Sequence, residues 1–189
     1  LNDDRVEKLM EYVLDADDEQ FRPLESAVLR HAKSAEPLLT EIARQTIHHD
    51  QSEAEKDRQA RRHANAAVCM FEMGQSQPFE TALIPESPND RRVQTWMIDR
   101  FSKASASDAA LRTHLEAALG KLKRERGAPR DGEARYACAL IVGDLAARLP
   151  QEALRARVVE TLQVVYENDP DAGVHSAAEW ALRQWNADD

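Results

Sequence analysis

The chain repeats one local pattern about every forty residues, and this recurrence restricts its fold more than any other feature of the sequence. Each copy is a turn rich in Pro, Gly, Asn or Asp, followed by a small or branched apolar residue and an alanine-rich amphipathic segment. Their apolar anchors are Val93, Ala134 and Val174, which lie 41 and 40 residues apart. A unit of two helices cannot bury its apolar face alone, so this period predicts a stack of helix pairs. The three turns are residues 87–93, 130–135 and 169–175.

Helices rather than strands are expected along the chain. Alanine and leucine supply much of the apolar content, aromatic residues make up 5%, and β-branched residues form no convincing alternating run. We expect one all-α domain over 1–189, with its clearest repeats at 78–187 and irregular helix pairs at 3–74. Apolar spacing of three and four residues predicts helices at about 3–16, 21–29, 35–47, 53–73, 79–83, 89–102, 107–125, 132–148, 151–167 and 171–186.

The charge balance argues against nucleic acids and anionic membranes as partners. The formal net charge is −9, from 34 acidic and 25 basic residues, and phosphate binding requires clustered Lys and Arg. The best basic runs, 58–62 and 121–126, carry no aromatic residues for base stacking, so we interpret them as solvated helix faces. No apolar stretch approaches the length needed to span a bilayer. We therefore expect a cytoplasmic protein that binds neither nucleic acid nor membrane.

The cysteines predict packing rather than chemistry. Cys69 and Cys138 each lie inside an apolar helical segment, which favours buried free thiols over a disulfide or a metal pair. A nucleophilic pairing of Cys69 with His63 is disfavoured, because the two are six residues apart on one helix. Buried free thiols also agree with a reducing cytoplasm.

Other candidate chemistry is equally sparse. His175 and Glu179 share a helical face, and residues 48–50 read His-His-Asp, but neither group has the further ligands of a zinc site. The glycine-rich, catalytic and metal-binding loops of protein kinases are missing, as is a Walker phosphate loop. We therefore expect no catalytic residue, no metal and no cofactor in this chain.

The segment 166–185, which contains Asn-Asp-Pro-Asp-Ala-Gly-Val-His, resembles the HEAT-like region of planctomycete-type multidomain bacterial proteins. Segments 60–68 and 88–101 support this resemblance, which extends from about residue 16 onward. The resemblance implies a right-handed α–α superhelix. It also implies flanking domains outside this chain: an N-terminal serine/threonine protein kinase and a C-terminal formylglycine-generating-enzyme-like domain. The chain begins with Leu1 rather than Met, so we expect a piece of a longer polypeptide.

The resemblance also assigns a role to the polar residue after each anchor. These residues are Gln94, Arg135 and His175, and in HEAT-type repeats such a residue reaches the aspartate of the adjoining turn. The Asp or Asn before each repeat helix is placed to cap that helix. The first turn, 87–93, departs from the pattern because it is one residue longer than usual, which leaves its register open.

These observations predict a non-catalytic helical-repeat scaffold that binds a protein partner or adjoining domains of its own polypeptide. Two alternatives stay open: a regulatory segment of a serine/threonine kinase, and a HEAT-type binder of nucleic acid or a small ligand. Trp180 and Trp185 cannot share one helical face fully, so at least one caps the core or anchors a partner. The candidate interaction surface consists of Arg92, Arg135, His175, Trp180, Arg183 and Trp185.

Overall fold

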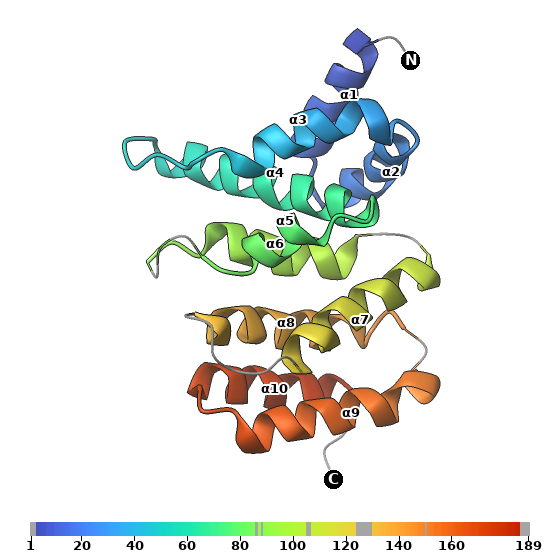
Figure 1. The fold of residues 1–189 in the computed structure, drawn as a ribbon, viewed down its shortest axis with the longest axis vertical. Helices are drawn as coiled ribbons and strands as arrows, with labels where there is room; N and C mark the ends of the chain where they lie inside the picture. Colours follow the sequence, from blue (N-terminus) through green and yellow to red (C-terminus); the bar gives the residue numbers. More distant parts are fainter. Residues whose placement is uncertain are drawn as a thin grey trace. The chain divides into compact units, whose positions relative to one another are not determined.

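A computed structural model describes residues 3–85, 87, 89–104, 107–123, 130–149 and 151–185. The described chain is all-helical, as the sequence predicts, and its helices α1 to α10 follow one another without a strand (Figure 1). One isolated bridge joins Ser87 to Asp90 in the turn before α6. None of the described helices combines the length and the apolar character required to cross a bilayer. The chain divides into two compact units, residues 1–105 and 106–189.

The first unit is built around α4. This helix packs against α1, α2, α3, α5 and α6, so five other elements bury its surface. Its second half is rich in alanine, and the residues from Ala64 to Met70 are all buried. Small side chains there allow the surrounding helices to approach closely. The helices of this unit are α1 (Asp3–Asp15), α2 (Asp18–Leu29), α3 (Ala32–Arg44), α4 (Glu53–Glu72), α5 (Ser76–Ala82) and α6 (Arg92–Lys103).

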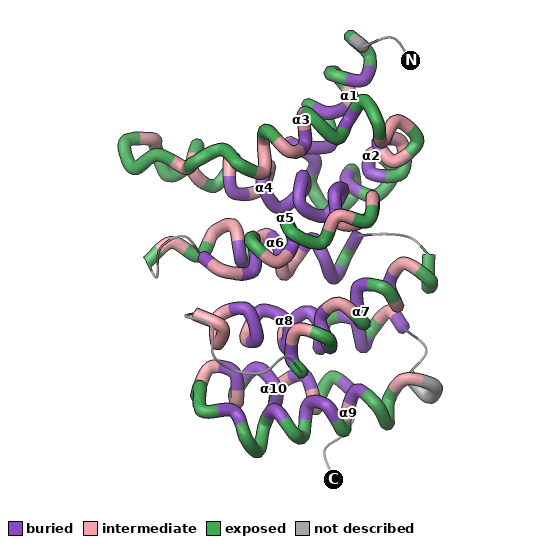
Figure 2. The backbone as a smooth tube through the Cα atoms, in the orientation of Figure 1, coloured by how far each residue is buried: buried purple, intermediate pink, exposed green. Residues whose placement is uncertain are grey.

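Local signals explain where α4 begins and ends. Ser52 and Glu55 form a capping box, in which each side chain bonds to the other residue's backbone N–H. Gly74 follows the helix with φ of 87°, a left-handed conformation that glycine adopts without strain. The first turns of α4, which are rich in charged residues, are mostly exposed, and its later, alanine-rich turns are buried (Figure 2).

The second unit contains two helix pairs. α8 packs against α7 and α10, and α9 packs against α10 and α7. α8 is buried nearly all round, with Ala137, Cys138 and Ala139 each fully inaccessible to solvent (Figure 2). α10 buries a narrower face that contains the anchor Val174. The helices of this unit are α7 (Asp108–Lys123), α8 (Asp131–Leu145), α9 (Gln151–Asn168) and α10 (Ala172–Gln184).

The capping expectation holds in part. Asp171 caps α10, because its carboxylate accepts from the backbone N–H groups of Gly173 and Val174 at 2.8 and 3.2 Å. At α8 the expected carboxylate does not cap the helix. Arg130 occupies the N-cap position with φ of 66°, and Asp131 lies inside the first turn instead. The residue Pro88 of the first turn lies outside the described residues.

Two boundaries differ from expectation. We expected Ile47 to continue the apolar stripe of the third helix, but α3 ends at Arg44 because Gln45 takes an extended backbone with ψ of 138°. Ile47 therefore belongs to the loop that leads to α4. The first repeat helix begins at Arg92 rather than near residue 89, after the Ser87–Asp90 turn. Its anchor Val93 is only half-buried, whereas Ala134 and Val174 are fully buried.

Candidate functional site

Two of the residues expected on an interaction surface are buried. Arg135 has 4% of its surface exposed and Trp185 has none. The indole Nε1 of Trp185 donates to the carbonyl oxygen of Val142 at 2.8 Å, which joins the end of α10 to α8. These two side chains hold the second unit together, so their assignment to an exposed surface is corrected. For Trp185 the structure supports the core-capping role that was left open.

Arg135 connects two successive repeat turns. Its Nε lies 2.8 Å from Oδ2 of Asp169, and its Nη2 donates to Oδ1 of Asp169 at 3.3 Å. Its Nη1 also donates to Asp131 at 2.6 Å. The side chain of Asp169 is 1% exposed. The contact between the residue after an anchor and the aspartate of the adjoining turn is therefore present at this position.

The equivalent residues at the other two anchors use backbone acceptors instead. Gln94 is buried, and its Nε2 donates to the carbonyl oxygen of Leu83 at 2.6 Å. His175 contacts the backbone oxygen of Asp169 through Nε2, and its ring meets the ring of Tyr166 edge-on with centroids 5.8 Å apart. Each of the three polar residues thus bonds to a segment outside its own helix, and Arg135 pairs with an aspartate side chain 34 residues away.

The remaining candidates on α10 are accessible. Arg183 has a side chain that is 63% exposed, and it pairs with Glu179 at 2.5 Å. Trp180 is half-buried, and its ring lies against the backbone of Gly143: a Cβ at that glycine would be 2.2 Å from Cζ3 of Trp180. The unit also exposes apolar surface on α9, where Val164 is 56% exposed. The second unit thus presents a mixed polar and apolar surface.

Arg92 belongs to a chain of alternating charges in the first unit. Its guanidinium contacts the carboxylates of Glu53 and Asp90. Glu53 in turn accepts from Nζ of Lys56 at 3.1 Å. The two cations and two anions balance one another, so this network carries no net formal charge.

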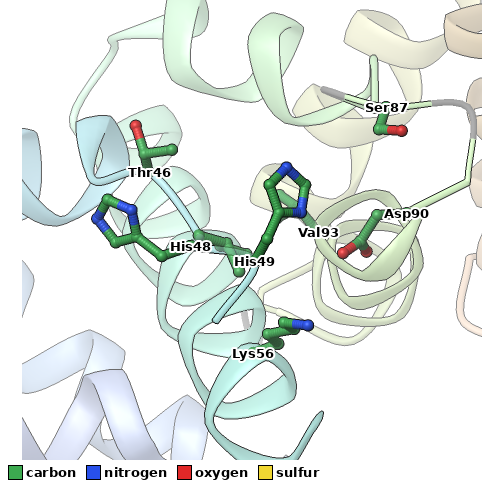
Figure 3. A pocket seen from close by; sticks show the side chains of 8 residues that line it. Thr46, His48, His49, Lys56, Ser87, Asp90 and Val93 are labelled. Atoms are coloured by element: carbon green, nitrogen blue, oxygen red, sulfur yellow. The ribbon is translucent and has the colours of Figure 1, made fainter. Parts of the chain in front are cut away.

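A pocket of about 250 Å³ adjoins this network (Figure 3). The loop after α3, the first turns of α4 and α6, and the residues Ser87 and Asp90 contribute to its walls. Figure 3 shows the ring of His49 on the side of Ser87 and Asp90, whereas the ring of His48 lies toward Thr46. The lining residues are Thr46, Ile47, His48, His49, Lys56, Ser87, Asp90 and Val93.

Two arginines of the basic run at 58–62 form ion pairs with carboxylates of α1. Arg58 binds Asp15 through two bonds of 2.9 and 2.6 Å, and this pairing lowers the pKa of the Asp15 carboxyl. Arg62 bridges Glu11 and Asp15 at 3.0 Å, with 15% of its side chain exposed. The interpretation as a solvated face is therefore wrong for Arg62, because α1 supplies two carboxylates opposite it. In the second run, residues 124–126 lie outside the described residues.

Sequence reasoning missed a buried arginine between α6 and the start of α2. Arg100 has 1% of its side chain exposed and donates to Asp18 at 2.6 Å and to the carbonyl oxygen of Ala16 at 3.0 Å. Its guanidinium also lies 5.4 and 5.5 Å from the ring centroids of Phe21 and Trp96. The four-residue spacing of Trp96 and Arg100 on one helix is the local signal that could have indicated part of this cluster.

The thiols and the buried imidazole do not form a catalytic pair. Cys69 and Cys138 are free and buried, as predicted, and burial raises the pKa of the Cys69 thiol well above its ordinary value. His63 is 6% exposed, and its Nε2 has no hydrogen-bond partner among the described residues. Burial, assisted by the charge of Arg62, lowers the pKa of His63 to about 4. No group of three or more metal-ligating side chains occurs in the described part of the chain.

Comparisons with known proteins place the chain in no family. No family model matches it, and no curated protein matches it. Among solved structures, the chain is similar to the crystal structure of an engineered protein, with 18% sequence identity and a TM-score of 0.39. That match covers 96% of this chain and 79% of the engineered one.

Proposed function

We propose that this chain is a helical-repeat scaffold of the HEAT type that binds a protein partner or an adjoining domain of its own polypeptide. The proposal includes a right-handed arrangement of the repeats and assigns no catalytic step or cofactor to these residues. It builds on the forty-residue period, on the family resemblance and on the packing of α7, α8, α9 and α10 as neighbouring helices in the second unit.

One observation carries the proposal most directly. The turn before α10 is tied to α8 by the buried pair of Arg135 and Asp169, whose Nε and Oδ2 lie 2.8 Å apart. Breaking a buried ion pair of this kind by removing one partner costs about 3–5 kcal/mol. The pair of Arg135 and Asp169 therefore favours one arrangement of α8 and the turn before α10. A scaffold of stacked repeats needs such fixed contacts between neighbours.

The binding surface of this scaffold is assigned to exposed groups of the second unit. Arg183 and Val164 are 63% and 56% exposed, so more than half of each side chain is accessible to a partner. Mixed surfaces of arginine and apolar side chains are common at the centres of protein interfaces. Substitution of these two residues should therefore weaken partner binding without unfolding the unit.

The test is affinity purification from the native lysate, followed by quantitative mass spectrometry. Wild type is compared with the double variant Val164→Asp/Arg183→Glu, and with a control that carries the exposed charge reversal Lys33→Glu in the first unit. Thermal unfolding first establishes that all three proteins fold. Proteins retained by wild type and by the control but lost from the double variant support the proposal. Equal recovery by all three would refute the surface, and recovery of no specific protein would refute binding to a separate partner.

The resemblance to planctomycete-type proteins provides the expected setting of this scaffold. We infer that it lies in a cytoplasmic polypeptide beside a serine/threonine kinase domain, a formylglycine-generating-enzyme-like domain or both. The interaction would then be interdomain. Co-expression of this chain with its flanking domains as separate polypeptides tests that form directly: complex formation supports it, and independent elution argues against it.

A further inference from the structure

We propose that the pocket beside His49 binds a small aliphatic carboxylate. The inference concerns the first unit alone and does not depend on the scaffold proposal. The pocket holds about 250 Å³, which is smaller than the roughly 300–1,000 Å³ of sites for drug-sized ligands. A ligand of a few carbon atoms, or one side chain of a peptide, is the size that it accommodates.

The first argument concerns uncommitted donors. The imidazole of His49 makes no hydrogen bond or ion pair with the described residues, although its ring is directed to the side of Ser87 and Asp90 (Figure 3). Ser87 Oγ accepts the backbone N–H of Asn89 at 3.3 Å, which leaves its hydroxyl hydrogen able to donate. Lys56 adds an ammonium group with 15% of its side chain exposed. One N–H of Lys56 donates to Glu53, and its other N–H groups, like the ring of His49, can still donate to an acceptor oxygen of a ligand.

The second argument concerns the charge that the ligand carries. The charged residues that line the pocket are Lys56 and Asp90, which balance each other, so the wall has no surplus positive charge for a dianion. Asp90 would repel a phosphate dianion more strongly than it would repel a singly charged carboxylate. A single carboxylate needs less compensation, and the ammonium of Lys56 and the imidazole N–H of His49 can supply it through charge-assisted hydrogen bonds.

The third argument concerns the apolar part of the ligand. Ile47 and Val93 also line the pocket and offer hydrocarbon surface next to the donors. The loop that presents His49 is held in place, because the Oε1 of Gln51 accepts the backbone N–H of His48 at 2.9 Å. Small-molecule sites typically combine such an apolar wall with a few fixed polar groups. An aliphatic chain that ends in a carboxylate satisfies both parts of this pocket.

The ligand can come from two sources, a free short-chain acid or a glutamate side chain on a peptide. The probes are sodium butyrate and the blocked dipeptide acetyl-Leu-Glu-amide, each titrated into the full chain while the backbone amide and histidine ring resonances are followed by NMR, so that binding is also measured in variants that lack one ring. Butyramide, which has the shape of butyrate without its charge, and sodium chloride at equal ionic strength are the controls. We expect saturable shifts of the His49 ring with a dissociation constant on the order of millimolar, as befits a ligand of few atoms.

Variants distinguish a built site from general attraction of anions. His49→Ala should weaken butyrate binding by about tenfold, and Lys56→Met should do the same, since each removes a donor to the carboxylate. His48→Ala is the matched control, because its ring lies at the Thr46 end of the pocket. It should change the affinity by less than about twofold. Far-UV circular dichroism establishes that each variant folds.

Each outcome decides the proposal. Saturable binding of butyrate alone assigns the pocket to a free acid, and binding of the dipeptide at equal or higher affinity assigns it to a peptide side chain. Shifts that do not saturate, equal shifts with butyramide, or equal losses in His48→Ala and His49→Ala would overturn the proposal. The scaffold proposal would be untouched by that failure, because its test uses the other unit.

Discussion

The effect of Gly143→Ala on the free energy of unfolding should change sign when Trp180 is replaced by alanine. A Cβ at Gly143 would lie 2.2, 2.7 and 2.9 Å from three ring atoms of Trp180, so Gly143→Ala forces the ring or the helices apart. Overpacking of this kind costs about 1–3 kcal/mol. Replacing a helical glycine by alanine contributes up to about 1 kcal/mol in the opposite direction. We expect Gly143→Ala to lower the free energy of unfolding by about 1–2 kcal/mol.

When Trp180 is replaced by alanine, the clash with its ring is removed, and only the higher helix propensity of alanine over glycine at residue 143 remains. Gly143→Ala should then raise the free energy of unfolding by up to about 1 kcal/mol. Urea denaturation followed by circular dichroism at constant m-value measures both changes without relying on tryptophan fluorescence. If Gly143→Ala has the same effect in both backgrounds, within about 0.5 kcal/mol, the two residues are not coupled and the close packing of α8 on α10 is refuted.

Three further predictions concern buried polar groups. Asn65→Ala removes an amide that donates to two carbonyl oxygens at the end of α1 at 3.0 Å, and should cost about 2 kcal/mol of unfolding free energy in urea denaturation. His63 has its pKa lowered from 6.5 to about 4 by folding, so the unfolded chain binds the proton first. Stability should fall as the pH drops from 6.5 toward 4, by about 3 kcal/mol in total, and His63→Leu should lack this component in denaturation at several pH values. Arg135→Met removes the guanidinium that pairs with the buried carboxylate of Asp169, and should cost about 3–5 kcal/mol, measured as a lower thermal midpoint.

Controls for these predictions come from the same chain. Arg183→Met removes an exposed ion pair of α10, and a loss above about 1 kcal/mol there would contradict the contrast with Arg135. A loss below about 0.5 kcal/mol for Asn65→Ala would mean that water replaces the amide. For His63, a wild-type pH profile parallel to that of the leucine variant would show that other groups cause the acid sensitivity.

The helices could be predicted because their signals are local. Apolar spacing, alanine content and caps identify all ten described helices, and most boundaries agree within a few residues. The end of α3 was missed because Ile47 fits the helical spacing, although it faces the pocket rather than the core. Of the three anchors that the forty-residue step aligns, Ala134 and Val174 are fully buried and Val93 is half-buried. The partition into two compact units has no local signal, since it depends on which helices meet.

The candidate site was harder to predict, because a sequence does not reveal what lies opposite a side chain. Arg135 and Arg183 look alike in sequence, yet one is buried against Asp169 and the other is exposed. Arg62 was interpreted as solvated because Glu11 and Asp15 lie about fifty residues away in the chain. The pocket combines the His-His turn with the turn before α6, and no pattern connected these segments. Partners at long range decide these roles.

The buried carboxylate of Asp169 has a consequence for how the second unit opens. Its Oδ1 accepts the backbone N–H of Asp171 at 3.0 Å while the same carboxylate binds Arg135, and Trp185 secures the other end of α10. Detachment of α10 would break the pairing of Asp169 with Arg135 and the bond of Trp185 to Val142 together. The amides of α8 and α10 should therefore exchange with solvent as one cooperative unit. The last described helix is therefore joined to the middle of its unit in its opening behaviour as well as in its packing.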